Sequence, residues 1–274
     1  MIFKDRGIEI KTREQILLMR KAGLVVGRTL ELLRAAVKPG ISTGELDAIA
    51  EDHIRSSGAT PSFKGYHGFT GSICASVNDE IVHGIPGDRV LADGDLISID
   101  CGAIVDGWHG DAAITVGVGE VASELLELAR ICEESMWHGF AAARLGGRLT
   151  DISAGVEKHV RGTSSYGIVE DFVGHGIGSA MHQPPNVPNY GRAGRGPKLI
   201  EGLALAVEPM LTLGKQDNHT LDDDWTVVTD DGSAAAHTEH TFTLTPQGPW
   251  VLTALDGGEA KLAELGIKTG ALAD

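Results

Sequence analysis

The stretch "ISIDCGAIVDGWHGD", residues 97–111, has the pattern of two strands that fold back on each other. Apolar residues alternate with polar or small ones, and Asp106-Gly107 is a dipeptide typical of two-residue hairpin turns. With the turn there, Gly102 faces Asp111, and Asp100 lies on the same face in the diagonal cross-strand position. Two carboxylates that share a partly desolvated space repel each other unless a proton or a cation lies between them. The hairpin therefore predicts one or the other.

The composition indicates a globular protein with a sizeable core. The chain has 274 residues, of which 42% are hydrophobic and 22% charged, so we expect one domain over residues 1–274 with halves of roughly 12–118 and 119–254. The formal net charge of −15 argues against nucleic acid and anionic membranes as partners. A single basic segment stands out, the Gly-rich loop "RAGRGPK" at residues 192–198, which holds Arg192, Arg195 and Lys198.

The cysteines and the N-terminal sequence indicate a cytoplasmic protein. Cys74, Cys101 and Cys132 are an odd number and lack Cys-x-x-Cys spacing, which argues against a disulfide framework or a structural zinc site. The start of the chain lacks an apolar signal core, and no apolar run approaches the length that spans a membrane.

The order of predicted elements is helix, helix, strands, and then the same again. Capping boxes formed by Thr12 with Gln15 and by Ser42 with Glu45 start two helices, which end near Pro39-Gly40 and at Gly58. The later segments are predicted as strands over residues 59–118, helices over 121–145 and 150–163, and strands with Gly/Pro loops over 168–254.

A shift of the chain by 106 positions supports an internal duplication. It matches Gly40 to Gly146, Glu51 to Glu157 and His53 to His159, although short helices can share such residues by composition. We therefore expect two related halves, whose sheets meet face to face with an active site in the crease. Both of the matched histidines are assigned by default to helix surfaces.

Three further acidic or imidazole groups lie in apolar or Gly-rich strands of the second half. They are His175 in "VGHGIG", Glu208 in "AVEPM" and Glu239 in "HTEHT". Each alone has a structural alternative, since a histidine between glycines is more often structural than a ligand and Glu208 before a proline can simply end a strand. Unpaired buried carboxylates cost several kcal/mol, so the set favours compensation by divalent cations. Oxygen-rich ligation with one nitrogen suits manganese, iron, cobalt or zinc.

Together these motifs resemble the methionine aminopeptidases of the pita-bread fold. Asp100 and Asp111 eleven residues apart, "GHGIG", "VEPM" and "TEHT", with "YHGF" and "VHGIP" upstream, follow one another in the family's order over about residues 12–254. The resemblance is to the bacterial type I short form, without a zinc-binding extension. It implies an α+β fold in which two pseudo-symmetric ααβ halves form a central curved antiparallel sheet with helices on the outside.

The resemblance also implies the site and its reaction. The single catalytic domain would remove the N-terminal methionine from nascent proteins and peptides with a small second residue. A hydroxide bridging two divalent ions would attack the first peptide carbonyl, with Asp111 and Glu239 shared between the ions. The metal ligands would be Asp100, Asp111, His175, Glu208 and Glu239, and the catalytic residues His83, His182 and Glu208.

The family likeness places an apolar pocket for the methionine side chain beside the two catalytic histidines. Phe63, Phe69 and Met181 depart from the residues common in relatives, which often have cysteine, tyrosine and phenylalanine there. These exchanges keep the pocket apolar, as suits a thioether. The substrate-binding residues would be Phe63, Tyr66, Phe69, Cys74, His83, Met181, His182 and Trp225.

Other interpretations remain open beside this one. A proline-specific aminopeptidase or dipeptidase uses the same fold and ligands, and a non-catalytic binding protein on this scaffold would be expected to have lost some of them. His109 lies on the face of Asp111 but has no ligand role in the family, and His237 is assigned a structural role. For partners we expect nascent N-termini, a monomeric state and weak ribosome contact through Arg192, Arg195 and Lys198, by attraction to RNA phosphates.

Overall fold

The hairpin around which the molecule is built has the predicted register. The computed structural model describes residues 7–272, in which β4 (Leu96–Val105) and β5 (Trp108–Gly117) form this hairpin. Its turn lies at Asp106 and Gly107, whose φ angles of 49° and 82° are those of a tight two-residue turn. Gly102 pairs with Asp111, as the sequence predicts.

The four long helices are at the predicted places. Both capping boxes are formed, and they begin α1 (Arg13–Ala36) and α2 (Thr43–Ser56). α1 ends before the predicted Pro39-Gly40 boundary, because the residues that lead into a proline prefer extended backbone. The second pair is α3 (Ser123–Ala142) and α4 (Leu149–Thr163). α2 and α4 begin at positions related by the 106-residue shift, which supports the duplication.

The main sheet combines strands from both halves. Its seven-strand path runs β1-β4-β5-β14-β9-β7-β8, with β2 beside β4 and β15 beside β14, and two small sheets have the orders β13-β10-β6 and β11-β12-β3. The strands added here are β1 (Thr60–Pro61), β2 (Ile73–Val77), β3 (Glu80–Val82), β6 (Gly167–Ile168), β7 (Gly174–Gly176), β8 (Gln183–Val187), β9 (Ala204–Val207), β10 (Met210–Thr212), β11 (Asn218–Thr220), β12 (Val227–Thr229), β13 (Ala235–His237), β14 (Glu239–Thr245) and β15 (Gly248–Val251).

The expectation of two sheets that face each other is therefore wrong. Glu239 pairs with Ala113 and His240 with Ala112, so β14 of the second half continues the sheet of the first half at β5. This pairing satisfies the backbone groups of two strands that would otherwise be sheet edges. The site lies on the inner face of the joined sheet instead of in a crease between two sheets.

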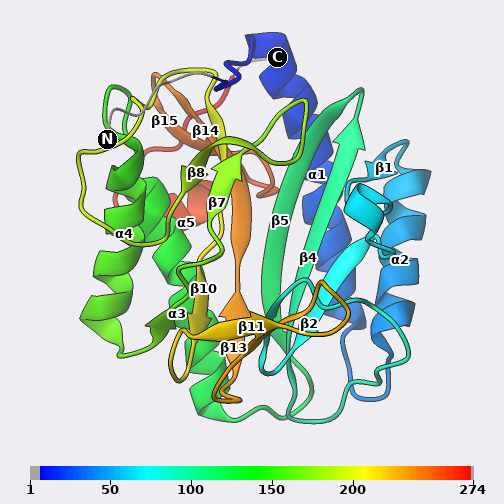
Figure 1. Ribbon diagram of the computed structural model, residues 1–274. Coiled ribbons are helices and arrows are strands. Elements are labelled where there is room, and N and C mark those ends of the chain that lie inside the picture. Colours follow the sequence, from blue (N-terminus) through cyan, green and yellow to red (C-terminus); the bar gives the residue numbers. More distant parts are fainter. Residues whose placement is uncertain (1–6, 273–274) are drawn as a thin grey trace.

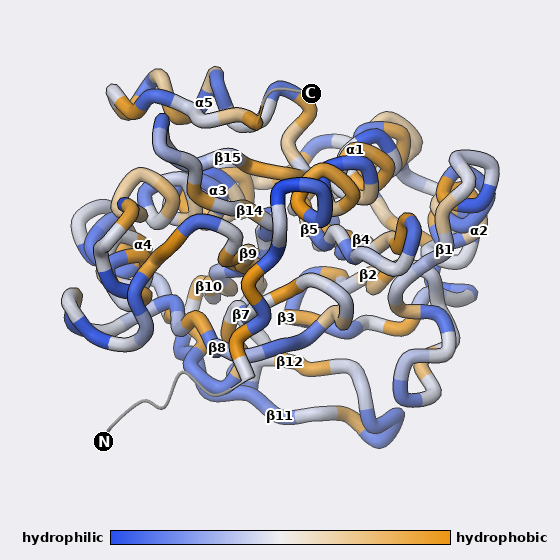
Figure 2. The backbone as a smooth tube through the Cα atoms, turned by 90° about the horizontal axis from the view of Figure 1, so that it is seen from above, coloured by the Kyte–Doolittle hydropathy of each residue, from blue (hydrophilic) through white to orange (hydrophobic). Residues whose placement is uncertain are grey.

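The helices cover the outer face of this sheet. In Figure 1 α1 and α2 lie on one side of the central strands and α3 and α4 on the other, and Figure 2 shows β11 and β12 across the sheet from α1 and α3. α1 packs closely against the chain that directly follows β15, and this contact requires glycine at position 23. A Cβ there would lie 2.2 Å from the Leu252 carbonyl oxygen. The cores form separately, one under α1 and α2 and one under α3 and α4.

The sequence patterns do not predict two short helical segments. The 3₁₀ turn η1 (Tyr66–Gly68) lies between β1 and β2, and α5 (Glu259–Glu264) follows β15. α5 has only six residues and no side-chain cap, so neither periodicity nor a capping box marks it. None of the helices in residues 7–272 combines the length and the apolar composition of a membrane span.

Candidate metal centre

A cavity of about 430 Å³ opens on the inner face of the sheet, and all five predicted metal ligands line it. β4 and β5 bring Asp100 and Asp111, and β7 brings His175. Glu208 directly follows β9, and Glu239 begins β14. Residues far apart in the chain converge here because β5, β14, β9 and β7 are neighbours in one sheet.

The ligand atoms form two overlapping groups. One atom each of Asp111, His175 and Glu239 lie within 4.8 Å of one another, and one atom each of Glu208, His237 and Glu239 do the same. Glu208 connects the imidazoles, with Oε1 at 3.4 Å from His175 Nε2 and Oε2 at 3.8 Å from His237 Nε2. Glu239 thus belongs to both groups.

Burial changes the protonation of these groups. It raises the pKa of Asp100 to about 7, and it raises the pKa of Asp111, Glu208 and Glu239 well above the ordinary values, with the neighbouring carboxylates adding to the rise. Burial also lowers the pKa of His175 to about 3, so its imidazole is neutral at physiological pH. Four carboxyl groups in one space therefore resist ionisation unless a cation compensates them.

The unpartnered atoms fit a cation better than a proton. One carboxylate oxygen of Asp100, one of Asp111 and one of Glu239 are buried without a hydrogen-bond partner, and so is His237 Nε2. Buried polar atoms are normally paired, and a cluster of free acceptors with neutral imidazoles is the donor set that divalent metals bind. The described residues thus fit a site for divalent metal.

An apolar pocket adjoins the carboxylates in the same cavity. Phe63, Phe69, Cys74 and Met181 form a buried cluster, against which Tyr66 and Trp225 pack. The rings of Phe69 and Trp225 meet edge to face, with centroids 5.0 Å apart. The structure therefore brings together the whole set predicted for the methionine side chain.

The two histidines predicted as catalytic also line the cavity. The ring of His182 lies 4.4 Å from that of His175, and its Nδ1 is 2.9 Å from the Tyr66 hydroxyl. His83 has a φ of 62°, a strained value for a side chain of its size, and contacts the Trp225 ring edge to face. Burial lowers the pKa of His83 to about 4 and also lowers that of His182, so both rings are neutral.

The remaining histidines differ in their relation to the cavity. His109 lies outside its lining, and its Nδ1 is 3.0 Å from Ser62 Oγ. His53 and His159 are half-buried on their helices, where they contact Thr29 and Glu134.

His237 lies within the cavity although the sequence favoured a structural role for it. Its two-residue spacing from Glu239 was the available signal. Gln183 also lines the cavity, and sequence reasoning missed it, since only its position next to His182 could have indicated it.

Comparison with known proteins agrees with this geometry. The model of metallopeptidase family M24 matches residues 17–246. The chain is 52% identical over 246 residues to the methionine aminopeptidase of Clostridium perfringens, covering 90% of this chain and 98% of that one. It is 54% identical over 241 residues to methionine aminopeptidase 1 of Mycobacterium tuberculosis, covering 86% and 91%.

Solved structures give the same result for the fold. The methionine aminopeptidase of Thermotoga maritima superposes with a TM-score of 0.88 at 38% identity, covering 90% of this chain and 99% of that one. A prolidase from Pyrococcus furiosus shares the fold at a TM-score of 0.71 and 22% identity, and only 65% of its length is covered. The predicted α+β pita-bread fold and the resemblance to methionine aminopeptidases are confirmed. The chain belongs to metallopeptidase family M24.

Proposed function

We propose that the protein is a methionyl aminopeptidase, which removes the N-terminal methionine from proteins and peptides with a small second residue. The observation that carries the proposal is a buried group of carboxylates and imidazoles at the inner end of an apolar pocket. Relatives that bear the name methionine aminopeptidase and match over almost their whole length support the same activity.

Asp100, Asp111, His175, Glu208 and Glu239 would hold two divalent ions. Manganese, iron, cobalt and zinc all suit this mixture of carboxylates and one imidazole. When bound, such ions supply Lewis acidity and bring the pKa of water toward neutrality.

Glu208 is the proposed proton carrier. Its carboxylate lines the cavity between His175 and His237, where it would take a proton from the attacking water and hold it until the leaving amine accepts it. His182 would stabilise the negative charge that develops on the carbonyl oxygen. In the tautomer whose Nδ1 accepts from the Tyr66 hydroxyl, the His182 ring presents an N–H at Nε2 for this purpose. His83 would contact the substrate near the scissile amide.

The pocket would select the first residue of the substrate. Phe63, Phe69, Cys74 and Met181 offer a buried apolar lining, and transfer of a methionine side chain into it is worth about 1.5–3 kcal/mol. Tyr66 and Trp225 would complete this lining. The second residue would lie beside the carboxylates and His182, where bulk displaces the reacting carbonyl.

The alternative is a proline-specific aminopeptidase or dipeptidase of the same fold. Initial rates with Met-Ala-Ser and with an Ala-Pro peptide, each measured on the metal-loaded enzyme and after chelation, distinguish the two. Cleavage of Met-Ala-Ser that depends on metal supports the proposal. A preference for the Ala-Pro peptide would replace it by the proline-specific alternative.

We further propose that the whole chain acts as a single catalytic domain and as a monomer in the cytoplasm, on nascent N-termini. Three free, buried cysteines support a reducing compartment. Weak contact with the ribosome would use Arg192, Arg195 and Lys198, all exposed in the loop beside the start of α4. Ribosome co-sedimentation should fall when these three charges are reversed and should weaken with salt. Unchanged co-sedimentation would contradict this contact.

A further inference from the structure

A short segment before α1, residues 8–11, lies against the loop that carries His182. We name them the N-terminal segment and the β7–β8 loop, residues 177–182. The backbone N–H of Lys11 donates to the Gly202 carbonyl oxygen at 2.8 Å, which ties the N-terminal segment to the body of the protein. The backbone of the N-terminal segment is therefore anchored, so its side chains can hold the β7–β8 loop in place.

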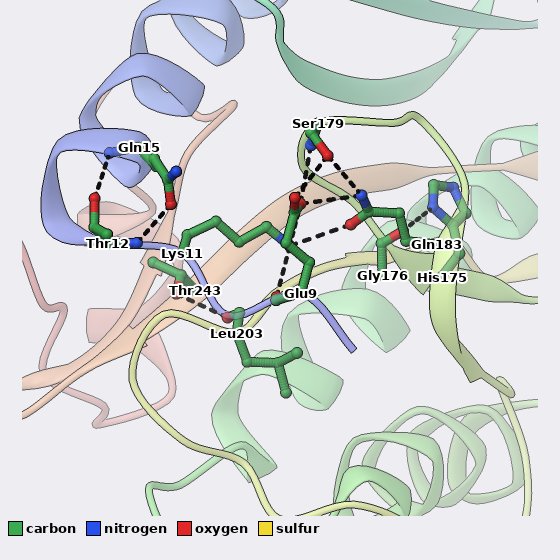
Figure 3. A network of polar contacts seen from close by, with 10 residues as sticks. All are labelled: Glu9, Lys11, Thr12, Gln15, His175, Gly176, Ser179, Gln183, Leu203 and Thr243. Atoms are coloured by element: carbon green, nitrogen blue, oxygen red, sulfur yellow. Dashed lines mark hydrogen bonds and ion pairs between the residues drawn. The ribbon is translucent and has the colours of Figure 1, made fainter. Parts of the chain in front are cut away.

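The carboxylate of Glu9 accepts three hydrogen bonds from the β7–β8 loop and its end. The Ser179 N–H donates to Oε2 at 3.0 Å and the Ser179 hydroxyl to Oε1 at 2.6 Å, and Gln183 Nε2 donates to Oε2 at 3.0 Å (Figure 3). Burial raises the pKa of Glu9, but these bonds and the charge of Lys11 outweigh it and lower the pKa to about 2. Glu9 is thus ionised at physiological pH, which strengthens every bond that it accepts.

Lys11 places a buried ammonium group at the same point. Its side chain is 1% exposed, and Nζ donates to the Glu9 carbonyl oxygen at 3.0 Å and to Gln183 Oε1 at 3.4 Å, while lying 3.5 Å from the Glu9 carboxylate. A lysine is almost never fully buried unless it is paired. Both ends of the Gln183 amide are therefore held, one by each charged residue.

The glycine that ends "GHGIG" fits this arrangement. A Cβ on Gly178 would lie 2.2 Å from Glu9 Oε2 and 2.3 Å from Lys11 Cε, so a larger residue there would displace the ends of the two side chains that hold the β7–β8 loop. On its other side the Gly178 carbonyl accepts from the His109 N–H at 3.0 Å, two residues from Asp111. The loop is thus held between the N-terminal segment and the strand that carries a proposed metal ligand.

The far end of the loop carries two residues of the proposed active site. Met181 belongs to the apolar pocket, and His182 contacts both His175 and Tyr66. Gln183, bound by Glu9 and Lys11, follows His182 directly and pairs with Gly176, next to His175. His182 lies between Ser179 and Gln183 in the chain. A shift of those two residues would therefore move the His182 imidazole.

We infer that Glu9 and Lys11 are positioning residues, which hold the β7–β8 loop so that His182 meets the reacting carbonyl of the substrate. This inference rests on the proposed function. Misplacement of a reacting group by about 1 Å can cost about a hundredfold in rate. Loss of the support should therefore lower kcat, because the interaction of His182 with the developing charge depends on its alignment.

The test compares Glu9→Gln and Lys11→Met with Gln15→Ala on the metal-loaded full chain. Gln15 is a matched control, because it closes the capping box with Thr12 a few residues away and donates nothing to the loop. With Met-Ala-Ser we expect Glu9→Gln and Lys11→Met to lower kcat about tenfold or more, with KM changed less than about threefold. Gln15→Ala should leave kcat unchanged.

Two readouts separate positioning from general stability. Amide exchange at Ser179 should be faster in Glu9→Gln, because its acceptor is weakened, and metal affinity by calorimetry should be unchanged. In a His182→Ala background, Glu9→Gln should lower kcat no further. A melting temperature lowered without loss of kcat, or a full additional loss in that background, would overturn the inference.

Ser179→Ala provides a milder variant in case Glu9→Gln fails to fold. It removes the hydroxyl of an exposed residue, which donates to Glu9 and accepts from Gln183 Nε2 at 3.2 Å, and it leaves the backbone bond of Ser179 and the carboxylate of Glu9 in place. We expect a smaller loss of kcat in the same direction. An unchanged kcat in Ser179→Ala with an unchanged exchange rate at its amide would count against the inference. Wild-type enzyme that leaves Met-Ala-Ser intact would refute the proposed function instead, while the Ser179 exchange rate still reports whether Glu9 holds the loop.

Discussion

Gly102 lies directly opposite Asp111 in the β4–β5 ladder, and Asp100 is two residues from Gly102 on the same strand. The two carboxylates are thus held in one space by backbone pairing and cannot separate without opening the hairpin. One oxygen of each is buried without a partner. This relationship makes the metal dependence of the protein directly testable.

Asp111→Asn should lose divalent metal and activity together. The amide that replaces the carboxylate carries no charge and offers one oxygen, so metal affinity falls. Metal content by mass spectrometry and cleavage of Met-Ala-Ser measure the two effects. Asp106→Asn is the matched control, since it lies in the turn of the same hairpin at a φ of 49°, which asparagine tolerates. Full activity of the Asp111→Asn variant, or of wild-type protein, after its metal-free state has been verified would contradict the prediction.

Asp100→Asn should stabilise the metal-free protein above pH 7. The pKa of Asp100 is raised from 3.8 to about 7 by burial, so its contribution to stability is present below the unfolded value and is lost as the pH rises through the folded one. The shift corresponds to about 4 kcal/mol at most. Urea unfolding at pH 8 should show the gain, and unfolding near pH 4 should show little change. Equal effects at both pH values would contradict the raised pKa.

The hairpin and the long helices could be predicted because their signals are local. A turn dipeptide sets the register of Gly102 and Asp111, and capping boxes mark the starts of α1 and α2 within four residues. The pairing of Glu239 with Ala113 joins the halves of the chain and has no local signal, so the sheets were wrongly expected to face each other. His175 and Glu208 were predicted to lie beside Asp100 and Asp111 from the family resemblance, not from sequence periodicity.

The contacts of the N-terminal segment could not be predicted for a related reason. Glu9 and Ser179 are 170 residues apart, and neither lies in a periodic pattern. Polar side chains before a helix ordinarily indicate a solvated segment, so nothing in the sequence distinguishes the buried Lys11 from an exposed lysine.

His237→Phe should weaken metal binding without unfolding the protein. His237 Nε2 is buried, has no hydrogen-bond partner and lies 3.8 Å from Glu208 Oε2, so it can orient that carboxylate or contact the ion. Loss of such a supporting group typically costs about 10–100-fold in metal affinity. Calorimetric titration with manganese measures the change. His219→Phe, at an exposed hairpin, is the control, and an affinity equal to the wild type would assign His237 a structural role only.

Phe63→Ala should change the choice of the first substrate residue and leave the choice of the second unchanged. Phe63 is 6% exposed and packs in the buried cluster with Phe69, Cys74 and Met181, so its removal enlarges the pocket. Methionine then fills the space less well and loses about 0.8 kcal/mol for each methylene no longer buried, whereas a phenylalanine side chain gains room. The ratio of kcat/KM for Met-Ala-Ser to that for Phe-Ala-Ser should fall about tenfold or more, within the 1–3 kcal/mol that such pockets discriminate.

Met-Lys-Ser should still be spared, because bulk at the second position is opposed by the groups around His182 and not by Phe63. Cleavage of Met-Lys-Ser by this variant, with the first-residue preference unchanged, would instead place Phe63 against the second residue.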